Sequence, residues 1–220
     1  MIFPFLTIFL IFATVTFVTM RRSANSYKIE QEKFIERERL ANSTRKQSID
    51  DLEYVSLDIS KIPMISSDNE RTLDLQKQIS NLSEEKIVNL SDFTNTDLKL
   101  KYGVANLPVL TEYDQNFTSM CRVLYDLSHQ YFNEGHKDEA KSLLEYGIKC
   151  GTDLNAHYLL LADIYEEEGQ YDKIDELVKH AENLKTLLKT SLIKKLNEKK
   201  NFKNSMDSLL NDEDMENIDI

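Results

Sequence analysis

The 220-residue chain is poor in the residues from which nucleotide, metal and redox sites are usually built. It holds five glycines, three prolines, two cysteines and four histidines. So few glycines leave no glycine-rich loop to hold phosphate groups. Cys121 and Cys150 are much farther apart than the two cysteines of a CxxC motif, so neither zinc binding nor redox work is indicated.

Histidine and serine offer no more chemistry. His129, His136, His157 and His180 do not have the spacing of a metal site such as HExxH. No base or orienting group can be assigned to any serine. We therefore expect a protein that is not an enzyme, with no cofactor, no metal and no nucleic-acid partner.

Charged residues are absent from Ile2–Met20, an unbroken run rich in Phe, Ile, Leu and Val. At about 1.5 Å per residue, this run approaches the roughly 30 Å hydrocarbon thickness of a bilayer. A cleaved signal peptide is the alternative, but it would need a basic segment before the run and a small-x-small site after it. We predict an uncleaved transmembrane anchor over residues 1–22.

The residues after the anchor predict its orientation. Arg21, Arg22 and Lys28 follow the apolar run, and positive charge favours the cytoplasmic side. Two cysteines in a chain of this length also fit a reducing compartment. We expect a single-pass protein of the cell membrane, with a very short N-terminus outside and the C-terminal domain in the cytoplasm. The bilayer is then a partner through the anchor.

The middle of the chain gives weaker signals. Alternating charges at helical spacing predict a solvated stalk helix within residues 23–50. Residues 51–104 form a poorly defined linking or packing segment. In it we expect a short extended stretch at Tyr54–Ile59, a helix over Asn69–Leu82, and a loop with a single helical turn at the start of Thr94–Leu110.

The second half of the chain contains an internal repeat. When Cys121–Leu154 is laid over Asn155–Leu188, small, aromatic and apolar residues keep their places. The coinciding pairs include Leu127 with Leu161, Ser128 with Ala162, Tyr131 with Tyr165, Gly135 with Gly169, and Leu143 with Leu177. A period of about 34 residues predicts one helix–turn–helix unit stacked on its copy, and units of this kind usually bind other proteins.

The pattern resembles the tetratricopeptide repeat. The matching residues are Leu124, Leu127, Ser128, Tyr131, Gly135 and Ala140 in the first unit, and Tyr158, Leu161, Ala162, Tyr165, Gly169 and Ala181 in the second. Ile174 stands where the family prefers alanine, and Thr152 and Thr186 replace its closing proline. The layout also resembles small membrane-anchored repeat proteins of low-GC bacteria.

We therefore expect an all-α fold, in which the anchor and stalk precede a short solenoid with capping helices. The repeat domain covers residues 105–203, with repeats at 121–154 and 155–188 and a capping helix at 184–203. The apolar face of this capping helix would be formed by Leu184, Leu187, Leu188, Leu192 and Leu196. Residues 204–220 carry acidic residues and, from Asp207 on, no basic one, so their composition predicts a disordered acidic tail. This tail either serves solubility or folds back over the lysines that precede it and competes with a partner.

The resemblance implies that the first helices of the repeats line a concave groove. Its lining residues would be Arg122, Tyr125, His129 and Asn133 in the first unit, and Ala156, Leu159, Asp163, Glu166 and Glu167 in the second. The clamp that some family members use for a C-terminal carboxylate is missing. Because the second unit is acidic, we expect a protein or peptide partner that carries Lys or Arg.

Two functions fit this layout. The first is a membrane-anchored adaptor or scaffold that presents its repeats to the cytoplasm. The second is a receptor or assembly factor that holds exported or unfolded clients at a membrane translocation machinery. Selective binding of one folded partner would favour the first function, and promiscuous binding of unfolded peptides the second.

Overall fold

A computed structural model describes residues 3–200 of the chain. Within this range the regular elements are helices, and the one β-type pairing is an isolated antiparallel bridge between Tyr54 and Val88. The chain forms two compact units. The anchor unit contains the residues up to Asp51 together with Phe93–Leu110, and the hairpin unit contains Leu52–Asp92 and the residues from Thr111 onward.

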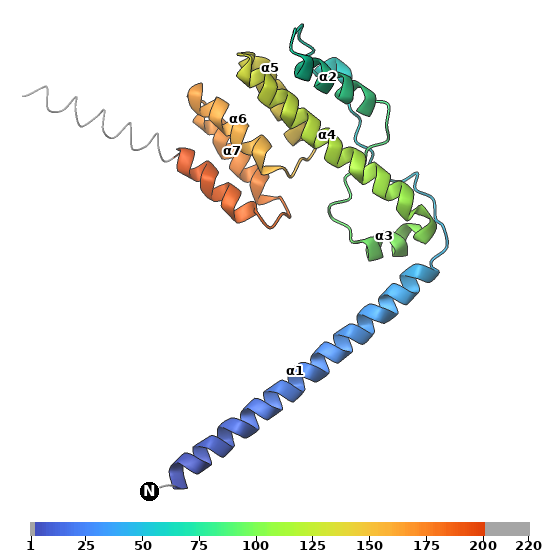
Figure 1. Ribbon diagram of the computed structural model, residues 1–220, viewed down its shortest axis with the longest axis vertical. Coiled ribbons are helices and arrows are strands. Elements are labelled where there is room, and N and C mark those ends of the chain that lie inside the picture. The colour runs from blue at the N-terminus through green and yellow to red at the C-terminus, as the bar shows by residue number, and fades with distance from the viewer. Residues whose placement is uncertain (1–2, 201–220) are drawn as a thin grey trace, which may run out of the picture. The chain divides into compact units, whose positions relative to one another are not determined.

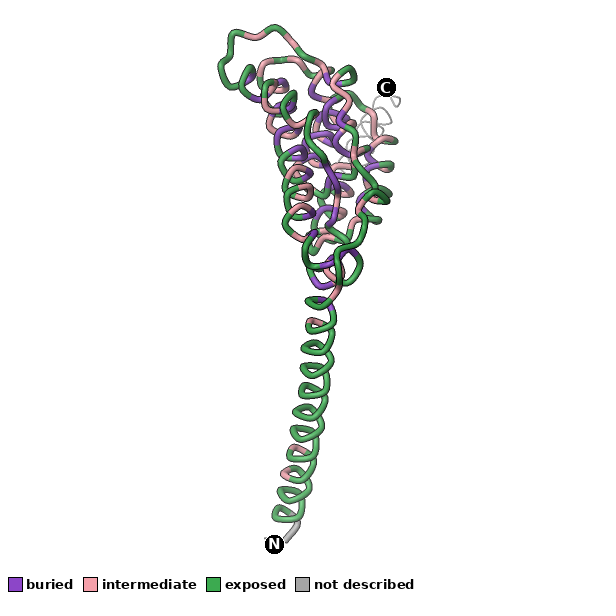
Figure 2. The backbone as a smooth tube through the Cα atoms, turned by 90° about the vertical axis from the view of Figure 1, so that its right-hand side faces the viewer, coloured by how far each residue is buried: buried purple, intermediate pink, exposed green. Residues whose placement is uncertain are grey.

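Helix α1 (Phe3–Ser43) is one uninterrupted helix of 41 residues. It is long and apolar enough to cross a membrane, and it lies exposed along almost its whole length (Figure 2). The helix ends at Ser43, so only part of the predicted stalk, residues 23–50, is helical. The hydroxyl groups of Ser43 and Thr44 donate to the Leu40 carbonyl oxygen at 2.8 and 3.0 Å, which is a local alternative to continuing the helix.

The end of α1 packs against α3 (Asn95–Tyr102) and the short helix η2 (Val104–Asn106). Arg37 pairs with Asp97 at 2.5 Å, and Lys99 pairs with Glu38 at 3.1 Å. The prediction of a single turn for α3 was too short. The Thr94 hydroxyl and the Asp97 carboxylate form a capping box that starts the helix, and buried Leu98 and Tyr102 hold its two turns.

Four helices follow, and they form two hairpins: α4 (Leu107–Asn133) with α5 (Lys137–Lys149), and α6 (Asn155–Glu167) with α7 (Tyr171–Glu182) (Figure 1). The helix boundaries recur with the period of the sequence repeat. The first helices end at the equivalent positions Asn133 and Glu167, and the second helices begin at the equivalent positions Lys137 and Tyr171. Residues 111–133 of α4 belong to the hairpin unit.

The two hairpin turns have the same geometry. Gly135 and Gly169 have φ values of +86° and +70°, which a residue with a Cβ rarely adopts. In each turn the next residue donates its backbone N–H to a tyrosine carbonyl oxygen, to Tyr131 at 2.9 Å and to Tyr165 at 2.8 Å. This is the bonding that closes a helix after a left-handed residue.

The core of the hairpin unit is built from the positions that repeat. Ser128 and Ala162 are fully buried, and so are Leu127 and Leu161. Each fully buried leucine contributes about 1.5–3 kcal/mol of transfer free energy. The apolar side chains on the inner faces of α4–α7 join into one hydrophobic cluster.

Residues 52–92 pack on these hairpins. They include the short helix η1 (Ile59–Lys61) and helix α2 (Glu70–Leu82), which Asn69 caps. The Tyr146 hydroxyl of α5 donates to the Ser56 carbonyl at 3.2 Å and accepts from the Asp58 N–H at 2.9 Å. Leu75 and Ile79 of α2 enter the same hydrophobic cluster. The predicted segment 51–104 is thus divided, since residues 93–104 belong to the anchor unit.

A further helix occupies residues 189–200, up to the last described residue. It begins later than the predicted capping helix at 184–203. The Thr186 hydroxyl accepts from the Leu188 N–H at 3.3 Å in the turn before it. Leu192 and Leu196 are buried as expected for a capping face, but Leu187 is fully exposed. Residues 201–203 and the acidic tail at 204–220 lie outside the described range.

Candidate protein-binding groove

The predicted groove residues of the first repeat lie along one face of α4. Arg122, His129 and Asn133 are exposed, and Tyr125 is half-buried. The rings of Tyr125 and His129 are 6.0 Å apart, and the Asn133 amide is 3.2 Å from His129 Nδ1. Three of the four residues therefore form a continuous aromatic and amide surface, with Arg122 one turn before it.

The predicted residues of the second repeat lie on α6 and are mostly engaged with other side chains. Ala156 and Leu159 are half-buried, and Leu159 packs against the hydrophobic cluster. The three carboxylates form ion pairs within the chain. Glu167 pairs with Lys137 at 2.5 Å, while Asp163 and Glu166 share a single lysine, Lys199.

Lys199 comes from the helix at residues 189–200 and bonds Glu166 at 2.9 Å as well as Asp163. Burial opposes its charge, but the hydrogen bonds to Asp163 and Glu166 outweigh that effect, so the pKa of the ammonium group lies above its usual value. The acidic side of the groove is consequently bordered by a basic residue from a third helix.

The two sets of groove residues meet through His157, a fully buried residue of α6. Its ring centroid is 5.7 Å from that of Tyr125 on α4. Gly147 of α5 leaves room for this ring, because a Cβ at that position would stand 2.6 Å from His157 Nε2. Neither ring nitrogen of His157 has a hydrogen-bond partner within the described residues.

Burial lowers the pKa of His157 to about 4, so the ring is neutral at physiological pH. A neutral ring costs less to bury than a charged one. It forms an apolar contact between the two hairpins beneath Tyr125. The spacing of α4 and α6, and hence of the two sets of groove residues, depends on this contact.

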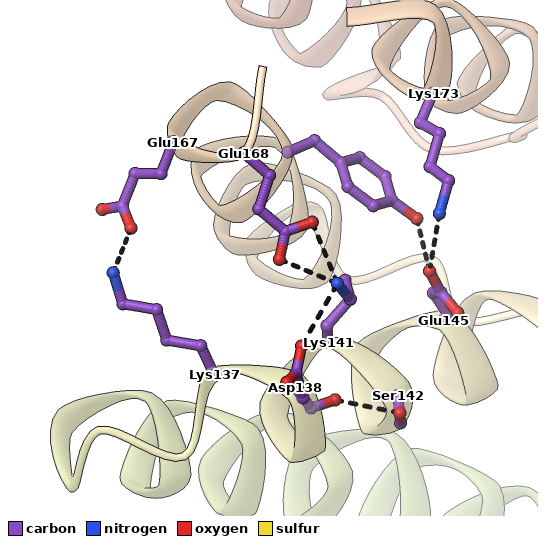
Figure 3. A network of polar contacts seen from close by, with 9 residues as sticks. Lys137, Asp138, Lys141, Ser142, Glu145, Glu167, Glu168 and Lys173 are labelled. Carbon is purple, nitrogen blue, oxygen red and sulfur yellow. Dashed lines mark hydrogen bonds and ion pairs between the residues drawn. The ribbon is translucent and has the colours of Figure 1, made fainter. Parts of the chain in front are cut away.

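Ion pairs and hydrogen bonds form a second contact between the hairpins (Figure 3). Lys141 of α5 pairs with Glu168 at 2.7 Å and with Asp138 at 3.4 Å. Glu145 of α5 accepts from the Tyr165 hydroxyl at 2.7 Å and lies 3.7 Å from the Lys173 ammonium. These contacts join α5 to the end of α6 and the start of α7, so the second hairpin is held in register with the first.

Sequence reasoning missed Lys199, His157 and Lys137 as neighbours of the groove. Lys199 stood in a lysine-rich stretch, with no signal to single it out. His157 faces Gly147 of the preceding helix, and this pairing becomes visible only once the two helices are packed together. Lys137 and Glu167 are far apart along the chain, so their ion pair becomes visible only when the hairpins are stacked.

Comparison with known proteins identifies no relative of this chain. No protein-family model matches the chain, and no curated protein and no solved structure matches it significantly. The groove therefore stays a prediction that rests on the chain's own repeat and on the side chains that the hairpins bring together.

Proposed function

We propose that the chain is a membrane-anchored adaptor or scaffold, in which tetratricopeptide-type hairpins bind a partner protein or peptide. The binding face is the groove formed by α4 and α6. The observation that carries the proposal is the matched geometry of the two hairpins, whose helix boundaries and glycine turns recur with the period of the sequence repeat. Stacked units of this kind expose a concave surface for binding.

Two features of the groove fit a peptide ligand. Tyr125 and Leu159 offer half-buried apolar surface, and His129 and Asn133 offer polar groups beside it. Exposed Arg122 at one end and the carboxylates of α6 at the other give the groove both signs of charge. An extended segment with a basic side chain opposite α6 satisfies both.

The anchor supports the membrane part of the proposal. The apolar half of α1 has the length of a bilayer span, and Arg21 and Arg22 follow it directly. In the proposed topology the hairpin unit lies in the cytoplasm at the surface of the cell membrane. The partner is then recruited to that surface rather than released into the cell.

Photo-crosslinking in cells tests this function. A crosslinking amino acid is placed at Tyr125 and, separately, at Glu167, with Glu176 on the exposed face of α7 as the control position. The expected result is one discrete adduct from both groove positions and none from position 176. Mass spectrometry of the adduct then identifies the partner.

Other outcomes discriminate between the alternatives. A smear of many clients from both groove positions would favour the receptor or assembly factor at a translocation machinery. Adducts from position 176 alone would place the binding face on the outer helices and contradict the groove.

A further inference from the structure

Lys199 occupies the acidic side of the proposed groove. Its ammonium group lies 2.9 Å from a carboxylate oxygen of Glu166 and also pairs with Asp163. Only 24% of the lysine side chain is exposed. Asp163 and Glu166 are one helical turn apart, so both carboxylates point from the same face of α6. Together they hold one alkylammonium group.

The local charges do not balance. The three carboxylates of Asp163, Glu166 and Glu167 face two ammonium groups, those of Lys199 and Lys137. Among the residues that the structure describes, three carboxylates thus share two ammonium groups, and this excess of negative charge favours a basic ligand. A lysine or arginine of a bound peptide that contacts Asp163 Oδ1 or Glu166 Oε2 would compete with Lys199 for that oxygen.

We infer that Lys199 is an intrachain competitor for the groove. It holds the place of a partner's basic side chain, and a basic peptide binds by displacing the Lys199 ammonium from Asp163 and Glu166. This inference rests on the proposed function, because it takes the α4–α6 groove as the binding face. The lysine thereby weakens binding of peptides with a single positive charge and favours partners with several.

The same helix supplies a matched control. Lys200 is the next residue, but its ammonium pairs with Asp175 of α7 at 2.6 Å, away from the groove acids. Leu192 and Leu196 are buried and hold the helix against the core independently of either lysine. Removing one charge therefore leaves the helix packed, and the two lysines differ in the acids they contact.

The experiment uses the full chain in nanodiscs of zwitterionic lipid and a fluorescein-labelled octalysine peptide as the probe. Fluorescence anisotropy at low salt compares the unsubstituted chain with Lys199→Gln and Lys200→Gln. We expect Lys199→Gln to bind about 1.5- to fivefold more tightly, the range that the loss of one surface ion pair gives. Lys200→Gln should bind as the unsubstituted chain does. Every variant keeps the acidic residues 207–220, so their contribution is common to all.

A third variant separates failure of the inference from failure of the proposed function. In Asp163→Asn with Glu166→Gln, octalysine binding should fall. If it falls while Lys199→Gln has no effect, or while both lysine variants strengthen binding equally, the competitor role is wrong and the groove remains. If it does not fall, octalysine does not use the groove acids, and both the basic-ligand groove and the competitor role are overturned.

Discussion

At the scale of single residues, the contact between Gly147 and His157 decides how closely the two hairpins approach. Gly147 is buried in the last turn of α5, where an alanine would ordinarily be preferred by up to about 1 kcal/mol. The glycine is explained by the ring of the fully buried His157, which fills the space that a Cβ would take. The glycine lowers the intrinsic helix propensity of α5 but allows close contact between the two hairpins.

This contact predicts that Gly147→Ala changes the free energy of unfolding in opposite directions with and without the His157 ring. Gly147→Ala should lower the free energy of unfolding, because overlap with the His157 ring costs about 1–3 kcal/mol and exceeds the gain in helix propensity. In a His157→Ala background the same substitution should raise it. Urea unfolding of the four proteins measures both effects. Additive changes would mean that the two side chains do not interact.

The buried imidazole also predicts a dependence of stability on pH. Its pKa is lowered from 6.5 to about 4 in the folded chain, so between these values the unfolded chain binds the proton and the folded chain does not. Stability from the neutral ring is complete above pH 6.5 and falls as the pH drops toward 4, by on the order of 3 kcal/mol. His157→Gln should lose this part of the acid sensitivity.

Denaturant unfolding between pH 7 and pH 4 measures this slope. His180→Gln is the matched control, since His180 is exposed on α7. The control should keep the slope of the unsubstituted chain. An unchanged slope in His157→Gln would show that other groups, such as the carboxylates, account for all of the acid sensitivity.

At the scale of helices, the carboxylate of Glu134, the residue after α4, bonds the start of α2. Glu134 accepts hydrogen bonds from Thr72 at 2.7 Å, Asn69 at 2.8 Å and Gln130 at 2.9 Å. The bonds from Gln130 and Thr72 keep the pKa of Glu134 below its usual value. Two of the donors belong to the start of α2, and the Thr72 side chain is fully buried. The carboxylate therefore fixes where this helix begins on the hairpin.

Glu134→Ala should loosen α2 selectively. The Thr72 hydroxyl loses its partner, and we expect a loss on the order of 1–2 kcal/mol. Hydrogen–deuterium exchange should rise in residues 63–82 more than in α6. Glu112→Ala, at an exposed position of α4, is the control and should leave exchange unchanged. Equal rises in α2 and α6 would point to general destabilisation.

The positions of helices and turns could be predicted best from the sequence, because short-range residue patterns determine them. The spacing of Leu75 and Ile79 after Asn69 predicted α2, and glycines at 135 and 169 predicted the hairpin turns. The length of α3 was underestimated because the Thr94–Asp97 capping box precedes a segment with few apolar residues. Leu187 matched the apolar spacing, but the turn at Thr186 removes it from the buried face.

The groove residues were predictable only as positions in the repeat. Their spacing along α4 and α6 follows from the period, because residues on one face recur every three or four positions. Their partners do not follow from it. Lys199 reaches Asp163 and Glu166 from a helix that departs from the repeat, so tertiary packing alone brings these three charges together.

At the scale of the whole molecule, the proposed membrane attachment depends on the apolar half of α1. Leu10→Arg combined with Val15→Arg should abolish stable insertion, since an arginine near the centre of a span costs about 2.5–3.5 kcal/mol on insertion scales. Carbonate extraction followed by sedimentation measures the membrane-bound fraction. Tyr27→Arg combined with Ile29→Arg lies beyond the span and should stay in the pellet. Release of both double variants would argue against this span.

The unbroken course of α1 has a mechanical consequence. A 41-residue helix is roughly 60 Å long, of which a bilayer core takes about half. Neither a glycine nor, beyond Pro4, a proline interrupts it, so it has no built-in hinge. In the proposed topology, tilt or rotation of the span in the bilayer is therefore transmitted along the helix to Arg37 and Glu38, where α3 is attached. In that topology α1 would pass motion of the span on to the unit that it carries, besides holding the chain at the membrane.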